Sequence, residues 1–187
     1  MKKLINVAMA SVLGLSVVGV SQASLPSNQG SGTVTFKGQI IDAPCAIEPE
    51  STNKVVEFGD LNAHVLNDGK KIVPFSIKLE NCDLADLKTK SGGKTPKNIV
   101  NIAFTGPMVN GKTYMLNAAG ETGVGVMIST LNNDTYIKMD GTPTPAAAFM
   151  NGKGEILLEA IATAADNSHG VLPGEFNVTA NFSLSYE

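Results

Sequence analysis

Residues 176–186 read Phe-Asn-Val-Thr-Ala-Asn-Phe-Ser-Leu-Ser-Tyr, and this stretch decides the fold class. Apolar side chains occupy every second position, and polar side chains fill the positions between them. Successive side chains of a β-strand point to opposite faces, so the pattern predicts a strand with one apolar face. That face consists of Phe176, Val178, Ala180, Phe182, Leu184 and Tyr186.

Other short runs of the same kind precede this stretch and are separated by turn dipeptides such as Asp68-Gly69 and Asn110-Gly111. One further run, Ile156–Ile161, fits either a strand or a short helical piece. About seven short strands with two cysteines predict an antiparallel β-sandwich of immunoglobulin type. The runs expected to form strands are Thr33–Ile41, Val55–Phe58, Phe75–Leu79, Val100–Phe104 and Val124–Ile128.

Composition narrows the possible functions of the chain. With 187 residues, of which 43% are hydrophobic, it has the size of one ordinary domain. All 14 basic residues are lysine and the formal net charge is −3, which argues against a nucleic-acid binder. Two histidines and two cysteines provide few metal ligands, and no cofactor motif is present. Without clustered titratable groups, the chain is not expected to be an enzyme.

The amino-terminal residues predict a secretory signal. Lys2 and Lys3 precede the uncharged, largely apolar stretch from Leu4 to Val20, and Ser21-Gln22-Ala23 places small residues at the cleavage positions. A membrane anchor is the alternative, but the stretch is at the short limit for spanning a bilayer. We expect residues 1–23 to be removed and the mature chain, without a membrane span, to be exported.

Cys45 and Cys82 are the only two cysteines and lie 37 positions apart. An oxidising compartment would join them in a structural disulfide. A free reactive thiol or a metal pair is the alternative, although neither cysteine has neighbours with metal-ligand spacing. The disulfide is therefore the prediction.

Neither end of the chain has an evident partner within the predicted sandwich. The strand at Phe176–Tyr186 has none of the lysines, prolines or bulges that normally protect an unpaired sheet edge. At the other end, residues 24–32 are polar and glycine-rich, and they lead into the alternating residues 33–37. A strand without a partner and a tail without a docking place together suggest strand exchange between molecules.

Several stretches resemble the subunits of chaperone–usher pili, particularly the rod pilins of P-type and type 1 fimbriae. They include Gly32–Gly38, Ile41–Cys45, Leu79–Cys82 and Phe104–Pro107. The C-terminal signature of these pilins has a penultimate tyrosine and a glycine fourteen positions from the end, and Tyr186 and Gly174 stand at those positions.

This resemblance implies an incomplete immunoglobulin-like sandwich that lacks its last strand and is completed by a strand from a periplasmic chaperone or a neighbouring subunit. It implies a donor extension at residues 24–37, a pilin domain at 38–187, and binding of chaperone or neighbour by Gly174 and the apolar face of residues 176–186. The outer-membrane usher and identical or related subunits are the other expected partners. The donor residues would be Gly30, Gly32, Val34 and Phe36.

The function implied is that of a structural subunit that polymerises head to tail into the rod of a surface fimbria involved in cell adhesion. A minor adaptor or tip pilin is the alternative. Export through the periplasm to the cell surface is expected.

Overall fold

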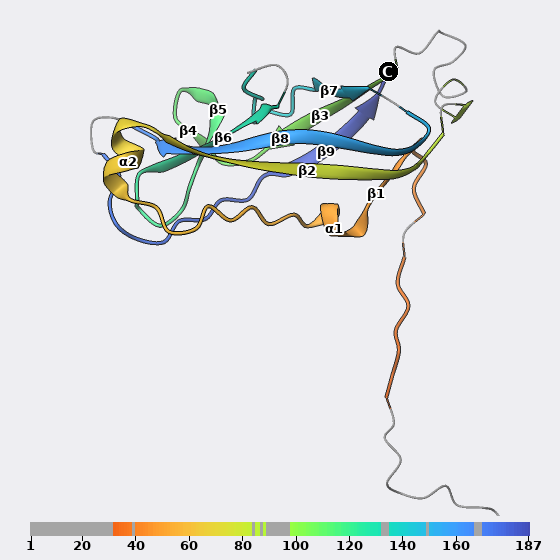
Figure 1. The fold of residues 1–187 in the computed structure, drawn as a ribbon, viewed down its shortest axis with the longest axis horizontal. Helices are drawn as coiled ribbons and strands as arrows, with labels where there is room; N and C mark the ends of the chain where they lie inside the picture. The colour runs from red at the N-terminus through yellow and green to blue at the C-terminus, as the bar shows by residue number, and fades with distance from the viewer. Residues whose placement is uncertain are drawn as a thin grey trace, which may run out of the picture. The chain divides into compact units, whose positions relative to one another are not determined.

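The computed structural model describes residues 32–38, 40–83, 85, 86, 88, 98–131, 135–148, 150–166 and 170–187 (Figure 1). The expected signal at residues 1–23 and the donor residue Gly30 lie outside the described residues. Two units are separated by their contacts, Met1–Gln39 and Ile40–Glu187. No helix among the described residues is long and apolar enough to cross a membrane.

The second unit is built from two antiparallel sheets. One has the strand order β1-β2-β8-β6-β5-β4 and the other has the order β7-β3-β9. Two short helices precede β2. The elements are β1 (Ala46–Ile47), α1 (Pro49–Thr52), α2 (Ala63–Asp68), β2 (Lys70–Cys82), β3 (Ile99–Thr105), β4 (Met108–Val109), β5 (Lys112–Asn117), β6 (Val124–Thr130), β7 (Thr144–Ala148), β8 (Gly152–Ala164) and β9 (Asn181–Tyr186).

The core lies between the two sheets. Alternate residues of β2 and β8, such as Ile77 and Ile156, pair across the ladder and are almost completely buried. They pack in one cluster with Val100, Ile102 and Phe104 of β3. Because each sheet covers one face of the other sheet, alternate side chains along a strand face the core and the side chains between them face the solvent.

The expected all-β, antiparallel architecture is confirmed, and four of the expected runs lie in strands β2, β3, β6 and β8. Ile156–Ile161, which fitted a strand or a helix, belongs to the 13-residue strand β8. The helices α1 and α2 and the short strands β1, β4, β5 and β7 were not predicted, because their sequences are too short or too polar to show a period.

Three expected strands differ from the structure. The described residues of Thr33–Ile41 contain no strand, and neither does Val55–Phe58. The strand expected over Phe176–Tyr186 begins only at Asn181, and before it a single bridge joins Asn177 to Ala119. A strand requires a backbone partner as well as an alternating sequence, and these segments have the alternation without the ladder.

Cys45 and Cys82 form a disulfide. Cys45 precedes β1, Cys82 ends β2, and both side chains are buried. The disulfide therefore ties the start of the second unit to the end of β2 in the larger sheet. A backbone hydrogen bond of 2.8 Å from the Asp83 N–H to the Pro44 carbonyl oxygen lies next to it.

Removing both cysteines (C45S/C82S) is expected to lower the free energy of unfolding by about 2–4 kcal/mol, because the bond restricts the unfolded chain. For a domain of this size the melting temperature should fall by roughly 5–15 °C. Thermal unfolding monitored by circular dichroism measures the change. Reduced wild-type protein is the control and should melt with the variant, whereas equal melting of the variant and the oxidised wild type would contradict the prediction.

Candidate strand-acceptor edge

β9 lies at the end of the three-stranded sheet, with β3 on one side only. Ile99 and Glu187 exchange two backbone hydrogen bonds, of 2.9 and 3.0 Å. Because such pairs alternate along an antiparallel ladder, Ser183 and Ser185 also direct their backbone groups at β3. The N–H and C=O groups of the residues between, Phe182 and Leu184, therefore point to the open edge.

The side chains of this segment divide between two faces. From 176 to 186 the even-numbered residues are half-buried and the odd-numbered residues are exposed. All six even-numbered side chains pack against the main core cluster, and the ring centroids of Phe182 and Phe104 lie 6.1 Å apart. Burial raises the pKa of the Tyr186 phenol above its ordinary value, because the phenolate would lose its hydration. The segment thus contributes an apolar strip that is only half covered.

A second segment without a backbone ladder lies beside the first. Residues 53–61, which join α1 to α2, belong to no strand, and residues 54–61 form no backbone hydrogen bond with another described residue. Figure 1 shows this run alongside the chain that enters β9, and the ring centroids of Phe58 and Phe176 are 5.9 Å apart. On its other side, a hollow of about 380 Å³ lies between residues 54–57 and β2. We call these two segments, 53–61 and 176–186, the acceptor edge.

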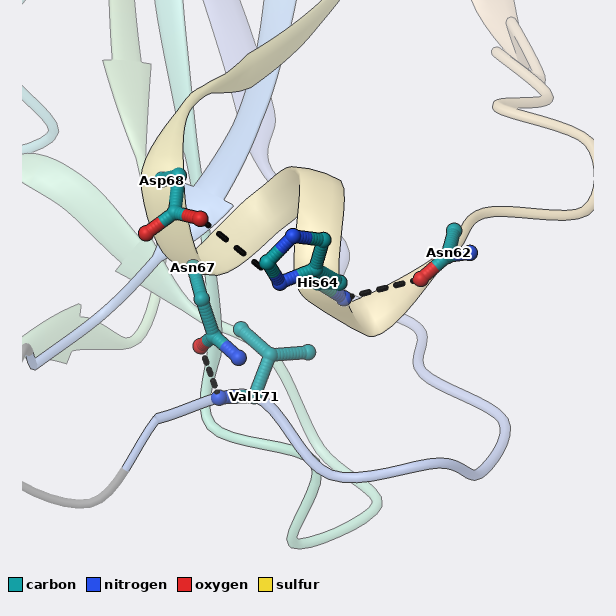
Figure 2. A network of polar contacts seen from close by, with 5 residues as sticks. All are labelled: Asn62, His64, Asn67, Asp68 and Val171. Carbon is teal, nitrogen blue, oxygen red and sulfur yellow. Dashed lines mark hydrogen bonds and ion pairs between the residues drawn. The ribbon is translucent and has the colours of Figure 1, made fainter.

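The two segments of the acceptor edge are tied together near α2. The side chain of Asn67 accepts a hydrogen bond of 2.5 Å from the Val171 N–H, which precedes the C-terminal segment. Figure 2 shows this amide oxygen directed at the Val171 nitrogen, with Asn62 at the start of the helix. Asn62 caps the helix by accepting from the His64 N–H. The hydrogen bond thus joins the chain just after the segment 53–61 ends to the chain just before the segment 176–186 begins.

Glycines allow the loop between β5 and β6 to hold the C-terminal segment closely. A Cβ on Gly120 would collide with the Glu175 carbonyl oxygen, and one on Gly123 would lie 2.7 Å from the Gly170 carbonyl oxygen. Both residues have a positive φ, 106° at Gly120 and 71° at Gly123, which is a backbone conformation that favours glycine. The Ala119 N–H also donates to the Asn177 carbonyl oxygen at 2.8 Å.

The structure describes three of the four expected donor residues. Val34 and Phe36 keep 75% and 91% of their side chains exposed, so neither contributes to the core. Gly32 has no atom near the position of an added Cβ. At the other expected site, Gly174 lies close to Thr122, whose methyl group would be 3.1 Å from an added Cβ.

The described residues contain no group of three or more His, Cys, Asp or Glu side chains that could hold a metal ion. His64 is exposed and lies 3.6 Å from Asp68, and His169 is outside the described residues. The features that stand out are apolar side chains and unpaired backbone, which suit the binding of a strand.

Known proteins share this architecture. A sequence model of the fimbrial protein family matches residues 34–187. The chain belongs to the fimbrial protein family. Within it, KS71A fimbrillin of Escherichia coli is 33% identical over 98% of this chain and 100% of its own length.

Two solved structures of the family extend the comparison. A chaperone–usher pilus, whose structure was determined to explain rod uncoiling, has a subunit 33% identical to this chain. The match covers 85% of this chain and 97% of that one, with a TM-score of 0.75. The P pilus rod subunit PapA is 30% identical over 78% of this chain and 100% of its own, with a TM-score of 0.69. The incomplete immunoglobulin-like sandwich expected from the sequence is therefore the fold of this family member.

Sequence reasoning missed one half of the acceptor edge. The run of Val55, Val56 and Phe58 predicts an ordinary strand, and nothing in the sequence indicates that residues 53–61 lack a ladder. The link from Asn67 to Val171 joins residues 104 positions apart and leaves no local pattern.

Proposed function

We propose that this protein is a structural subunit of a fimbrial rod and that it polymerises head to tail by donor-strand exchange. The open edge of β9 carries the proposal, because it presents the backbone of Phe182 and Leu184 together with a half-covered apolar strip. The similarity of this chain to a P pilus rod subunit, at 30% identity over the full length of that subunit, supports a rod role over an adaptor or tip role.

In this proposal the donor is the segment 24–37 of a neighbouring copy, preceded by a signal at 1–23 and followed by the pilin domain at 38–187. Val34 and Phe36 would enter the half-covered strip, and Gly30 and Gly32 would let the two backbones approach. Each subunit would fill its neighbour's edge and offer its own. Such a heterologous contact does not close on itself and produces a filament.

The same edge would need a temporary partner before assembly. An exposed apolar strand edge is an aggregation hazard, so we propose that a periplasmic chaperone supplies a strand until an outer-membrane usher passes the subunit to its neighbour. The finished polymer would lie on the cell surface and take part in adhesion. No catalytic role is proposed.

Abundance in the polymer tests the rod role. Surface filaments sheared from producing cells should give a main protein band that mass spectrometry identifies as this chain, and electron microscopy should show rods. A strain without the gene is the control and should yield no rods. Rods of normal length from that strain, or a trace amount of this chain in wild-type rods, would favour the adaptor role.

A further inference from the structure

The negative charge of the protein is concentrated in one stretch. Residues 40–68 contain one lysine and six carboxylates, a formal charge of −5, which equals that of the whole chain from residue 24 onward. Residues 24–39 contain Lys37 and no acidic residue. The six carboxylates belong to Asp42, Glu48, Glu50, Glu57, Asp60 and Asp68.

Two of these carboxylates lie on the acceptor edge. Glu57 and Asp60 belong to the segment 53–61 together with Lys54, so the formal charge of the segment is −1, and all three residues are exposed. The flanking Val56 and Phe58 are half-buried, so Glu57 faces solvent while its neighbours face inward. Neither carboxylate forms a hydrogen bond or ion pair with another described residue, in contrast to Glu48, which lies 3.9 Å from Lys78.

The proposed donor has a single charged side chain, Lys37, near the end that leads into the pilin domain. If Val34 and Phe36 face the core of the acceptor, strand alternation turns Lys37 to the solvent side, directly after Phe36. On the β9 side, the solvent-facing residues Asn181, Ser183 and Ser185 are uncharged, and the exposed Glu175 and Glu187 lie just outside the two ends of the segment 176–186. Within the acceptor edge itself, the carboxylates are therefore those of Glu57 and Asp60.

We propose that Glu57 and Asp60 form an acidic rim that receives Lys37 from the donor segment of a second copy of this chain. This inference rests on the proposed function, because it concerns how the same edge selects its strand. The rim attracts the basic end of the donor and fixes its position along the edge, while Val34 and Phe36 supply the apolar contact.

The acidic rim acts mainly on the rate at which the donor segment associates with the acceptor edge. Exposed ion pairs add little to affinity, but complementary charge accelerates encounter and disfavours wrong partners. Because the charges are exposed, salt should screen them over about 10 Å at 0.1 M ionic strength. The apolar contact depends little on salt, so the two contributions can be separated.

A labelled peptide of residues 24–39 is the probe, and its association rate with the purified full chain is measured by fluorescence anisotropy. For the wild type, the rate should fall about tenfold between roughly 20 mM and 500 mM NaCl. The E57K/D60K chain should bind the wild-type peptide about tenfold more slowly at low salt. A K37E peptide should bind slowly to the wild-type chain and recover its rate on E57K/D60K.

The E155K chain is the matched control for the single variant E57K, because both change the charge by two units and Glu155 is an exposed carboxylate on β8, outside the acceptor edge. E155K should bind the wild-type peptide at nearly the normal rate, and E57K should bind it more slowly. Equal rates for E57K and E155K, or no recovery with the K37E peptide, would overturn the acidic rim and leave strand capture intact. No binding of the wild-type peptide to the wild-type chain would contradict strand capture itself, and the rim with it.

Discussion

Replacing Val34 and Phe36 by asparagine (V34N/F36N) is expected to abolish polymerisation while the subunit itself still folds. Both side chains are exposed in the structure, so their loss leaves the core unchanged. In the proposed complex each contributes about 1.5–3 kcal/mol by burial. Losing both would weaken the contact by roughly 10²- to 10⁴-fold, and the buried amides would lower it further.

The measurement is the yield of sheared surface filaments from cells that produce only the variant with its own assembly proteins. T33N/T35N is the matched control, because it places the same amide groups at the neighbouring positions of opposite parity. Its filament yield should stay close to that of the wild type. Equal yields from V34N/F36N and T33N/T35N would contradict the assignment of donor residues.

The sequence predicted the C-terminal strand β9 more accurately than its surroundings. The alternation from Phe176 to Tyr186 is a local property, and it specifies which side chains face inward even where no ladder forms. The strand itself begins at Asn181 because β3 offers partners from Val100 to Thr105. Where a strand begins depends on the neighbouring strand, and a single sequence does not contain that pairing.

The runs Thr33–Ile41 and Val55–Phe58 show the converse. Both are predicted as strands from the sequence, and the described residues of neither form a strand in this structure. In a filament that exchanges strands as proposed, each run would find its partner in another copy, and the sequence pattern would then describe the polymer rather than the isolated chain. The acidic residues of 40–68 could be counted from the sequence, but only the fold places Glu57 and Asp60 beside the C-terminal segment.

Replacing Phe182 and Leu184 by aspartate (F182D/L184D) is expected to lower the amount of subunit in the periplasm at least tenfold. These side chains pack against the core cluster and also flank the open edge of β9. Aspartates there would place charges on an apolar strip, at a cost of several kcal/mol. S183D/S185D is the matched control, because those side chains are exposed, and its level should stay within about twofold of the wild type.

A milder variant separates docking from folding. F182A/L184A removes the apolar contact without adding charge, and part of the folded protein should survive. A saturating peptide of residues 24–39 at about 100 times its Kd should stabilise the wild type by about 2.7 kcal/mol, a rise in melting temperature of roughly 5–10 °C. The alanine variant should show a much smaller rise. A full rise in F182A/L184A, or equal periplasmic levels of F182D/L184D and S183D/S185D, would mean that strand capture occurs elsewhere on the protein.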